Sequence, residues 1–221
     1  MRISANPVIP EWLNLTALPD LTGWLADYFG ESVEVDDADW DKRGDEITSR
    51  LHTDSPGMKL ESVLRYNRPL LEDGEIDYEF YYEPGKTMVH PALDRLTFLL
   101  EPDGVKVHWL TNAQYERTGL KPDNAFTETE SLRGPASLPL KAKDWNRLTL
   151  SLAGDRVTVR LNQTEIYART LEPTNQRIFG LFHYADETDV RVRNVTYSGH
   201  WPRKLPVSLT QDLEAIEHKA K

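Results

Sequence analysis

Hydrophobic and polar residues alternate strictly along residues 74–83. Ile76, Tyr78, Phe80 and Tyr82 occupy every second position, and carboxylates occupy most of the positions between them. Because successive side chains of a strand point to opposite faces, this pattern predicts a strand with one face in the core and one at the surface. The surface face carries crowded negative charge, which requires either a ligand or neighbouring Arg and Lys side chains.

Short apolar runs separated by turn residues continue along most of the chain. Residues 101–104, 153–155 and 162–164 have the composition of β-hairpin connections. Between Arg156 and Leu161 apolar and polar residues alternate, which is typical of an antiparallel sheet with one buried face. The strands that we expect cover residues 58–66, 75–83, 94–101, 104–111, 145–152, 155–162, 164–171, 177–184 and 188–197.

The chain divides into three segments. Residues 1–20 predict an extended lead-in that covers an edge of the sheet, and residues 21–203 predict one all-β antiparallel domain of two sheets. Residues 112–144 are rich in Gly, Pro and Asn, so we expect the longest loop there. Residues 204–221 form a tail in which a capping pattern at Ser208 predicts a short C-terminal helix.

Composition excludes several classes of function. The net charge of −10 opposes binding to nucleic acid or to an anionic membrane, and no apolar run is long enough to insert into one. The absence of cysteine excludes disulfides, thiol catalysis and cysteine metal sites. No apolar segment follows Met1, so the chain as given carries no secretory signal, which indicates either a cytoplasmic protein or a piece of a longer exported precursor.

Residues 145–201 carry a recognisable pattern of strands and turns. A Trp opens a strand at residue 145, a tight hairpin follows at 154–157, Leu161 precedes Asn162, and alternating apolar residues end at Asn194. This pattern resembles the concanavalin A-like lectin/glucanase superfamily of the LamG type, which implies a jelly-roll sandwich. Gln163 stands where that superfamily usually has Gly, so a different turn is expected there.

A second resemblance covers residues 58–203. Together with the segments 89–93 and 171–177, this region resembles a bacterial domain-of-unknown-function family within the same superfamily. Such domains occur in large, mostly exported multidomain proteins. The resemblance therefore implies a fold, and other domains of a parent protein as partners, but no activity.

The acidic strand also resembles the Glu-x-Asp-x-Glu motif of laminarinase- and lichenase-type glycoside hydrolases. That resemblance implies Glu75 as nucleophile, Asp77 as the residue that tunes it and Glu79 as acid/base. A retaining glycosidase needs carboxyl groups about 5–5.5 Å apart, whereas residues i and i+4 of a strand lie roughly 13 Å apart. Catalysis therefore requires both side chains to lean together, and no Trp lies beside the motif in sequence to serve as a sugar platform.

Several histidines and aromatic residues are candidate ligand contacts. His108 alternates onto a polar face in residues 106–109, and no two histidines have the spacing of metal ligands. We expect Trp24 and Trp145 in the core, and Trp109 and Tyr115 exposed beside the long loop. The residues assigned to ligand binding are Tyr81, His108, Trp109, Tyr115 and His183.

Metal binding has less support. The acidic segments 36–39 and 186–189 carry hard oxygen ligands of the kind that calcium prefers, but neither has a repeated ligand pattern. We therefore expect solvated turns and no cofactor. Arg191 and Arg193, with Arg177 nearby, are expected to lie across the sheet from the carboxylates and to neutralise them.

The sequence leaves three functions open. The first is a non-catalytic carbohydrate-recognition or structural accessory module of a larger bacterial protein, with a poly- or oligosaccharide as partner. The second is a retaining glycoside hydrolase on β-glucan-like polysaccharide. The third is a structural protein–protein interaction domain.

Overall fold

A computed structural model describes residues 12–28, 31–33, 39–53, 56–57, 59–70, 73–110, 125–129, 134–135 and 137–199. These residues form two antiparallel sheets that enclose one main core, so the predicted all-β sandwich is confirmed. The predicted C-terminal helix lies outside the described residues. In the described part of the chain, no helix has the length and apolar character needed to span a membrane.

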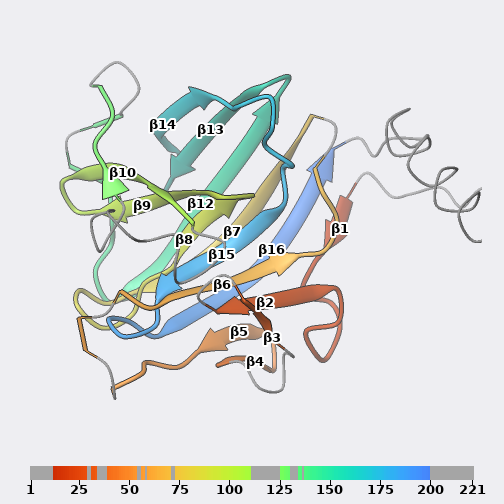
Figure 1. Cartoon of the computed structure of the whole chain (residues 1–221), viewed down its shortest axis with the longest axis vertical. Coiled ribbons are helices and arrows are strands. Elements are labelled where there is room, and N and C mark those ends of the chain that lie inside the picture. The colour runs from red at the N-terminus through yellow and green to blue at the C-terminus, as the bar shows by residue number, and fades with distance from the viewer. Residues whose placement is uncertain are drawn as a thin grey trace, which may run out of the picture.

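The first sheet, called sheet A, contains the acidic strand β7 near its middle. Figure 1 shows its long strands β7, β12 and β16 running side by side. Strand β1 (Trp12–Asn14) lies off the main strand order and pairs with residues 196–198 of β16, and the role of residues 1–20 as a lead-in over a sheet edge stays a prediction. The other strands follow in the order β14 (Thr164–Thr170), β13 (Arg156–Leu161), β12 (Asp144–Ala153), β7 (Gly74–Tyr82), β16 (Val190–Gly199), β5 (Glu46–Ser49) and β4 (Trp40–Arg43).

The second sheet, called sheet B, packs on the inner face of sheet A. Its strands come from separate parts of the sequence, which is the interleaving expected of a jelly roll. They follow in the order β11 (Ala125–Phe126), β10 (Gly104–Trp109), β9 (Leu96–Glu101), β8 (His90–Leu93), β15 (Phe179–Tyr184), β6 (Glu61–Tyr66), β2 (Trp24–Tyr28) and β3 (Glu31–Val33).

The alternation of β7 places its apolar side chains in the core, as predicted. Ile76, Tyr78 and Phe80 are fully buried between the sheets, and Tyr82 is nearly so. Leu148 and Leu150 of β12 lie directly opposite Tyr78 and Ile76, so the inner faces of neighbouring strands share one core. Burial of large apolar side chains is the main source of stability in such a sandwich.

The turn at Gln163 shows how this chain manages without the usual Gly. Asn162 and Gln163 have φ values of 48° and 72°, the left-handed pair that a two-residue type I′ hairpin requires. Asn162 compensates through its side chain: Oδ1 accepts the Arg147 N–H at 3.0 Å, and Nδ2 donates to the Pro139 carbonyl at 2.8 Å. The hairpin between β13 and β14 is therefore retained.

The nine expected strands are found with small shifts of their ends, but β8 and the short strands β1 to β5 and β11 were not among them. Proline lacks the N–H that a strand donates to its neighbour, and residue 91 of β8 is a proline. In the structure the main-chain pairing of β8 with β9 covers only Ala92 and Leu93. Further along, the ring nitrogen Nδ1 of His90 accepts the Leu100 N–H at 3.0 Å in place of a backbone carbonyl.

Candidate functional site

The outer face of sheet A carries the predicted catalytic residues. Strand β7 places Glu75, Asp77, Glu79 and Tyr81 on this face, with Glu75 exposed and the other three half-buried. On β12, the residues opposite them include Arg147, which lies in register with Glu79. The strand pairing therefore brings cations next to the carboxylates.

Two of the three carboxylates have a close arginine partner. Arg147 Nε lies 2.9 Å from both carboxylate oxygens of Asp77, and Thr149 Oγ1 donates to the same group at 2.8 Å. Arg193 Nε donates to Glu79 at 2.6 Å. These hydrogen bonds use part of the acceptor capacity that a sugar hydroxyl would require.

Glu75, the most exposed of the three, is held mainly by a hydroxyl group. Ser151 Oγ donates to it at 2.6 Å, and Arg160 lies at 3.8 Å. Glu75 and Glu79 have different partners on different strands. Each carboxylate is therefore bound to a neighbouring side chain of the sheet. The catalytic role of Glu75, Asp77 and Glu79 stays a prediction.

One row of this face is a ladder of alternating charge. The residues directly in register across five strands are Arg43, Glu46, Arg193, Glu79 and Arg147. Opposite charges placed side by side stabilise a sheet, whereas like charges destabilise it. The prediction that Arg residues neutralise the carboxylates is confirmed, although the positions differ in part.

Arg177 was expected on this face, and that expectation is wrong. It lies just before β15 of sheet B, where its carbonyl accepts the Leu70 N–H at 2.9 Å. Arg147, which sequence reasoning had not singled out, pairs with Asp77 instead. The alternation along β12 did indicate this position, because Arg147, Thr149 and Ser151 occupy every second residue and therefore lie on one face of the strand.

Trp145 was expected in the core, and this is also wrong. Inward positions of β12 begin at Asn146, so Trp145 lies on the outer face, half-buried and opposite Tyr81 with ring centroids 5.7 Å apart. The guanidinium of Arg193 lies 4.0 Å from the Trp145 ring centroid, and that of Arg191 lies 4.9 Å from the Tyr81 centroid. An aromatic residue thus stands beside the acidic motif, but an arginine already stacks on it.

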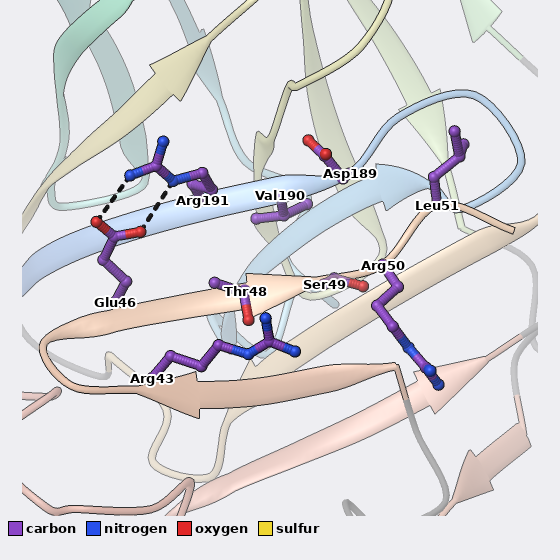
Figure 2. A pocket seen from close by; sticks show the side chains of 9 residues that line it. All are labelled: Arg43, Glu46, Thr48, Ser49, Arg50, Leu51, Asp189, Val190 and Arg191. Atoms are coloured by element: carbon purple, nitrogen blue, oxygen red, sulfur yellow. Dashed lines mark hydrogen bonds and ion pairs between the residues drawn. The ribbon is translucent and has the colours of Figure 1, made fainter.

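A hollow of about 390 Å³ lies at the end of this face near β4 and β5 (Figure 2). The bidentate pair Arg191–Glu46, with distances of 2.9 and 3.0 Å, crosses one side of it. Arg43 and Arg50 line it and pair with Asp41 and Asp39. No aromatic side chain is among its lining residues, which are Arg43, Glu46, Thr48, Ser49, Arg50, Leu51, Asp189, Val190 and Arg191.

A cluster of polar side chains is buried on the outer face of sheet B. His108 was expected on a polar surface, but it is fully buried: its Nε2 lies 2.8 Å from Glu61 Oε1, and its Nδ1 lies 3.4 Å from the Tyr184 hydroxyl. Phe182 packs against the same imidazole, with ring centroids 5.3 Å apart. A second, smaller hydrophobic cluster surrounds these groups, which explains the burial.

His183 and His90 are buried as well. His183 lies between the sheets, where Ser49 Oγ is 2.9 Å from its Nε2 and the Thr188 carbonyl is 2.9 Å from its Nδ1. Burial lowers the pKa of His183 to about 4 and that of His90 to about 3, because both lose the water that would solvate an imidazolium. The ligand-binding roles predicted for His108 and His183 stay predictions, although neither side chain is accessible to solvent.

The larger hollow, called the end hollow, lies at one end of sheet B and has a volume of about 640 Å³. Strands β2, β6 and β10, the β8–β9 turn and the loop before β15 all contribute to it. Its lining residues are Leu25, Asp27, Arg65, Asp94, Arg95, Trp109, Glu172, Thr174, Asn175, Gln176 and Ile178. The lining is mostly polar: one indole and two aliphatic side chains stand among amide, hydroxyl and charged groups that can exchange hydrogen bonds with a polar ligand.

The polar walls of the end hollow are held in place. Arg65 forms an ion pair with Asp27, which is 5% exposed, and burial lowers the pKa of the Arg65 guanidinium. Asn175 Nδ2 donates to the Leu93 carbonyl at 3.1 Å. The Gln176 N–H donates to Asp94 at 3.0 Å, which ties the loop before β15 to the β8–β9 turn.

Trp109 forms the aromatic wall. It is half-buried, packs in part against the main core and has the guanidinium of Arg169 at 5.9 Å from its ring centroid. Arg169 also holds Glu172 at 2.5 Å. Of the predicted ligand contacts, the described structure places Trp109 in the end hollow and Tyr81 on the opposite sheet, whereas Tyr115 lies outside the described residues.

Sequence reasoning missed the other residues of the end hollow. Asp27 and Arg65 come from strands that pair only in three dimensions. The run Thr174-Asn175-Gln176 did contain a signal, since amide and hydroxyl side chains gather in a short loop between two strands. A loop of this composition was a candidate for ligand contacts.

The acidic turns considered for calcium have other roles where they are described. Asp186 accepts the N–H groups of Lys59 at 3.0 Å and Leu60 at 2.7 Å. Asp39 pairs with Arg50 and His52, and residues 36–38 lie outside the described part. The described residues contain no group of three His, Asp or Glu side chains arranged to hold a metal ion.

Comparison with known proteins identifies the fold. The model of the domain of unknown function DUF1583_N matches residues 55–204. The carbohydrate-binding module CBM66 from Bacillus subtilis superposes with a TM-score of 0.50 at 16% identity, over 80% of this chain and 96% of that one. The carbohydrate recognition domain of Emp46p in its potassium-bound form gives 0.50 at 11% identity, over 86% and 96%. No curated protein sequence matches the chain.

These likenesses show a concanavalin A-like jelly roll. Identities this low establish the shared fold alone. What the molecule does must be argued from its own side chains.

Proposed function

The chain belongs to the DUF1583_N family, whose description names no activity, and we propose that it is a carbohydrate-recognition module that binds a neutral sugar in the end hollow. The observation that carries the proposal is the hollow itself, in which the Trp109 ring stands among fixed amide and charged groups. An aromatic face complements the apolar face of a pyranose, and amides and carboxylates exchange hydrogen bonds with its hydroxyl groups.

Charge within the end hollow favours a neutral ligand. Asp27, Asp94 and Glu172 supply three carboxylates, against the two guanidiniums of Arg65 and Arg95. One of those guanidiniums is already paired with Asp27. The protein carries a net charge of −10 in addition, so a polyuronate or sulfated glycan is repelled.

The two similar solved structures add support from their printed descriptions. One is a carbohydrate-binding module and the other a carbohydrate recognition domain. The matching family is described as a domain, which supports the further proposal that this chain acts as an accessory module of a larger protein. No described feature favours hydrolysis over binding.

Affinity electrophoresis on a panel of polysaccharides tests the proposal. We expect at least one neutral polysaccharide among xylan, mannan, laminarin and mixed-linkage β-glucan to retard the protein, and polygalacturonate and alginate to leave its mobility unchanged. Gln176→Ala removes an exposed amide of the hollow and should weaken that retardation. Migration unaffected by every neutral polysaccharide would contradict the proposed function.

A further inference from the structure

Sheet B is strongly curled, and one buried pair spans the curl. Strands β6 and β10 are separated by β15, β8 and β9. In a flat sheet four strand intervals amount to about 19 Å. Yet His108 Nε2 of β10 lies 2.8 Å from Glu61 Oε1 of β6, so the sheet bends until these two side chains meet.

The pair is enclosed by apolar and aromatic groups. Glu61 is 2% exposed and His108 is 0% exposed. The rings of Phe182 and Tyr184 lie 5.3 and 5.6 Å from the imidazole, between the two strands that the pair connects. In such surroundings a carboxylate–imidazole hydrogen bond is strengthened, and a partner left alone is strongly disfavoured.

The strands joined by the pair also contribute residues to the lining of the end hollow. Arg65 lies on β6, four residues beyond Glu61, and Trp109 directly follows His108 on β10. The row between Arg65 and His108 consists of Gly180, Ala92 and Thr97. A Cβ on Gly180 would lie 3.0 Å from Val63 Cγ2, so this row has little room for larger side chains on the curled face.

We propose that Glu61 and His108 are positioning residues that fix the curl of sheet B and thereby the spacing of Arg65 and Trp109. The proposal rests on the function proposed for the end hollow. Neither residue contacts the sugar. Their effect on binding passes through the separation of the two walls, because stacking on an indole and hydrogen bonding to the opposite wall require one fixed width.

A distance measurement tests the curl without any ligand. The chain has no cysteine, so Asn67→Cys after β6 and Asp103→Cys before β10, both at exposed positions, accept spin labels selectively. In double electron–electron resonance we expect the labels to move apart in Glu61→Leu and to return to the wild-type distance in Glu61→Gln, whose amide oxygen still accepts from His108. A folded Glu61→Leu with the wild-type distance would overturn the proposal.

The second part of the proposal, that the pair sets the spacing of Arg65 and Trp109 for ligand binding, is tested by calorimetry with the neutral oligosaccharide that binds wild type. We expect Glu61→Leu to weaken affinity about tenfold and Glu61→Gln to stay within about threefold of wild type. Ser49→Ala, which removes the equally buried bond to His183 between the sheets, should lower the melting temperature and leave affinity unchanged. Wild-type affinity in Glu61→Leu, or a loss in Glu61→Gln as large as that in Glu61→Leu, would contradict the proposal.

The outcomes separate this inference from the function on which it rests. If wild type binds no neutral sugar, the proposed function fails while the label distances still decide the role of the pair in the curl. If Glu61→Leu does not fold, His108→Leu breaks the same bond from the other strand. If neither variant folds, the pair is a general folding determinant and the positioning role is overturned.

Discussion

The outer face of sheet A and the end hollow of sheet B are both rich in charged residues, but they are built differently. On sheet A, Glu79 and Arg193 come from adjacent strands in register, and regular pairing places opposite charges side by side. In the end hollow, Asp94 and Gln176 come from a turn and a loop that converge. Regular strand pairing thus produces a surface whose charged side chains bind one another. Loops that converge at the end of the sheet leave a hollow lined by polar side chains. Crowded carboxylates alone do not indicate a site.

The largest expected effect is that of acid, which acts on two buried histidines outside both regions. His90 and His183 have folded pKa values of about 3 and about 4, below the ordinary 6.5, so only the unfolded chain takes up protons as the pH falls from 6.5 toward 4. Their contribution to stability is complete above pH 6.5 and is lost below it, by roughly 2 kcal/mol each at pH 5. Urea denaturation at pH 7 and pH 5 measures this loss.

His183 is one of the two buried histidines that produce this acid response. His183→Gln should therefore remove about half of the difference in unfolding free energy between pH 7 and pH 5. Equal stability at the two pH values would contradict the burial of both histidines. If His183→Gln kept the full difference in unfolding free energy between pH 7 and pH 5, His183 would not be a source of the acid response.

Breaking the charge ladder should have a moderate effect. Arg193→Ala removes the ion pair with Glu79 and the guanidinium stacked on Trp145. Because Arg193 is about one-third exposed, we expect a loss of only about 1 kcal/mol in the free energy of unfolding. Sugar affinity at the end hollow should not change, and a large loss of affinity would link the two regions that the comparison separates.

The smallest effect is expected at Glu75. Its carboxylate is about half exposed and bonded to a serine, so Glu75→Gln should change stability by less than about 0.5 kcal/mol. The same variant examines the hydrolase alternative. We expect wild type to release no reducing sugar from β-glucans, whereas hydrolysis by wild type that disappears in Glu75→Gln would establish the catalytic reading.

The sequence predicted what depends on local pattern. Alternation from Ile76 to Tyr82 identified the central strand and its buried face, and hairpin signals located most of the others. Sequence reasoning failed at β8, where the His90 side chain replaces a backbone hydrogen bond. It also failed at Trp145, where a shift of one residue in the alternation decides which face of the sheet a side chain occupies. The end hollow could not be derived, because Asp27, Arg65 and Glu172 are far apart in sequence and meet only through the pairing of β2 with β6 and the return of a distant loop.

The central claim is that sugar recognition belongs to the end hollow and not to the acidic face. The most direct test compares Trp109→Ala with Trp145→Ala, two half-buried indoles each close to an arginine but on opposite sheets. Calorimetric titration with the retained neutral oligosaccharide should show a loss of at least about tenfold in affinity for Trp109→Ala and wild-type affinity for Trp145→Ala. Wild-type affinity in Trp109→Ala together with lost binding in Trp145→Ala would contradict the account and move recognition to sheet A.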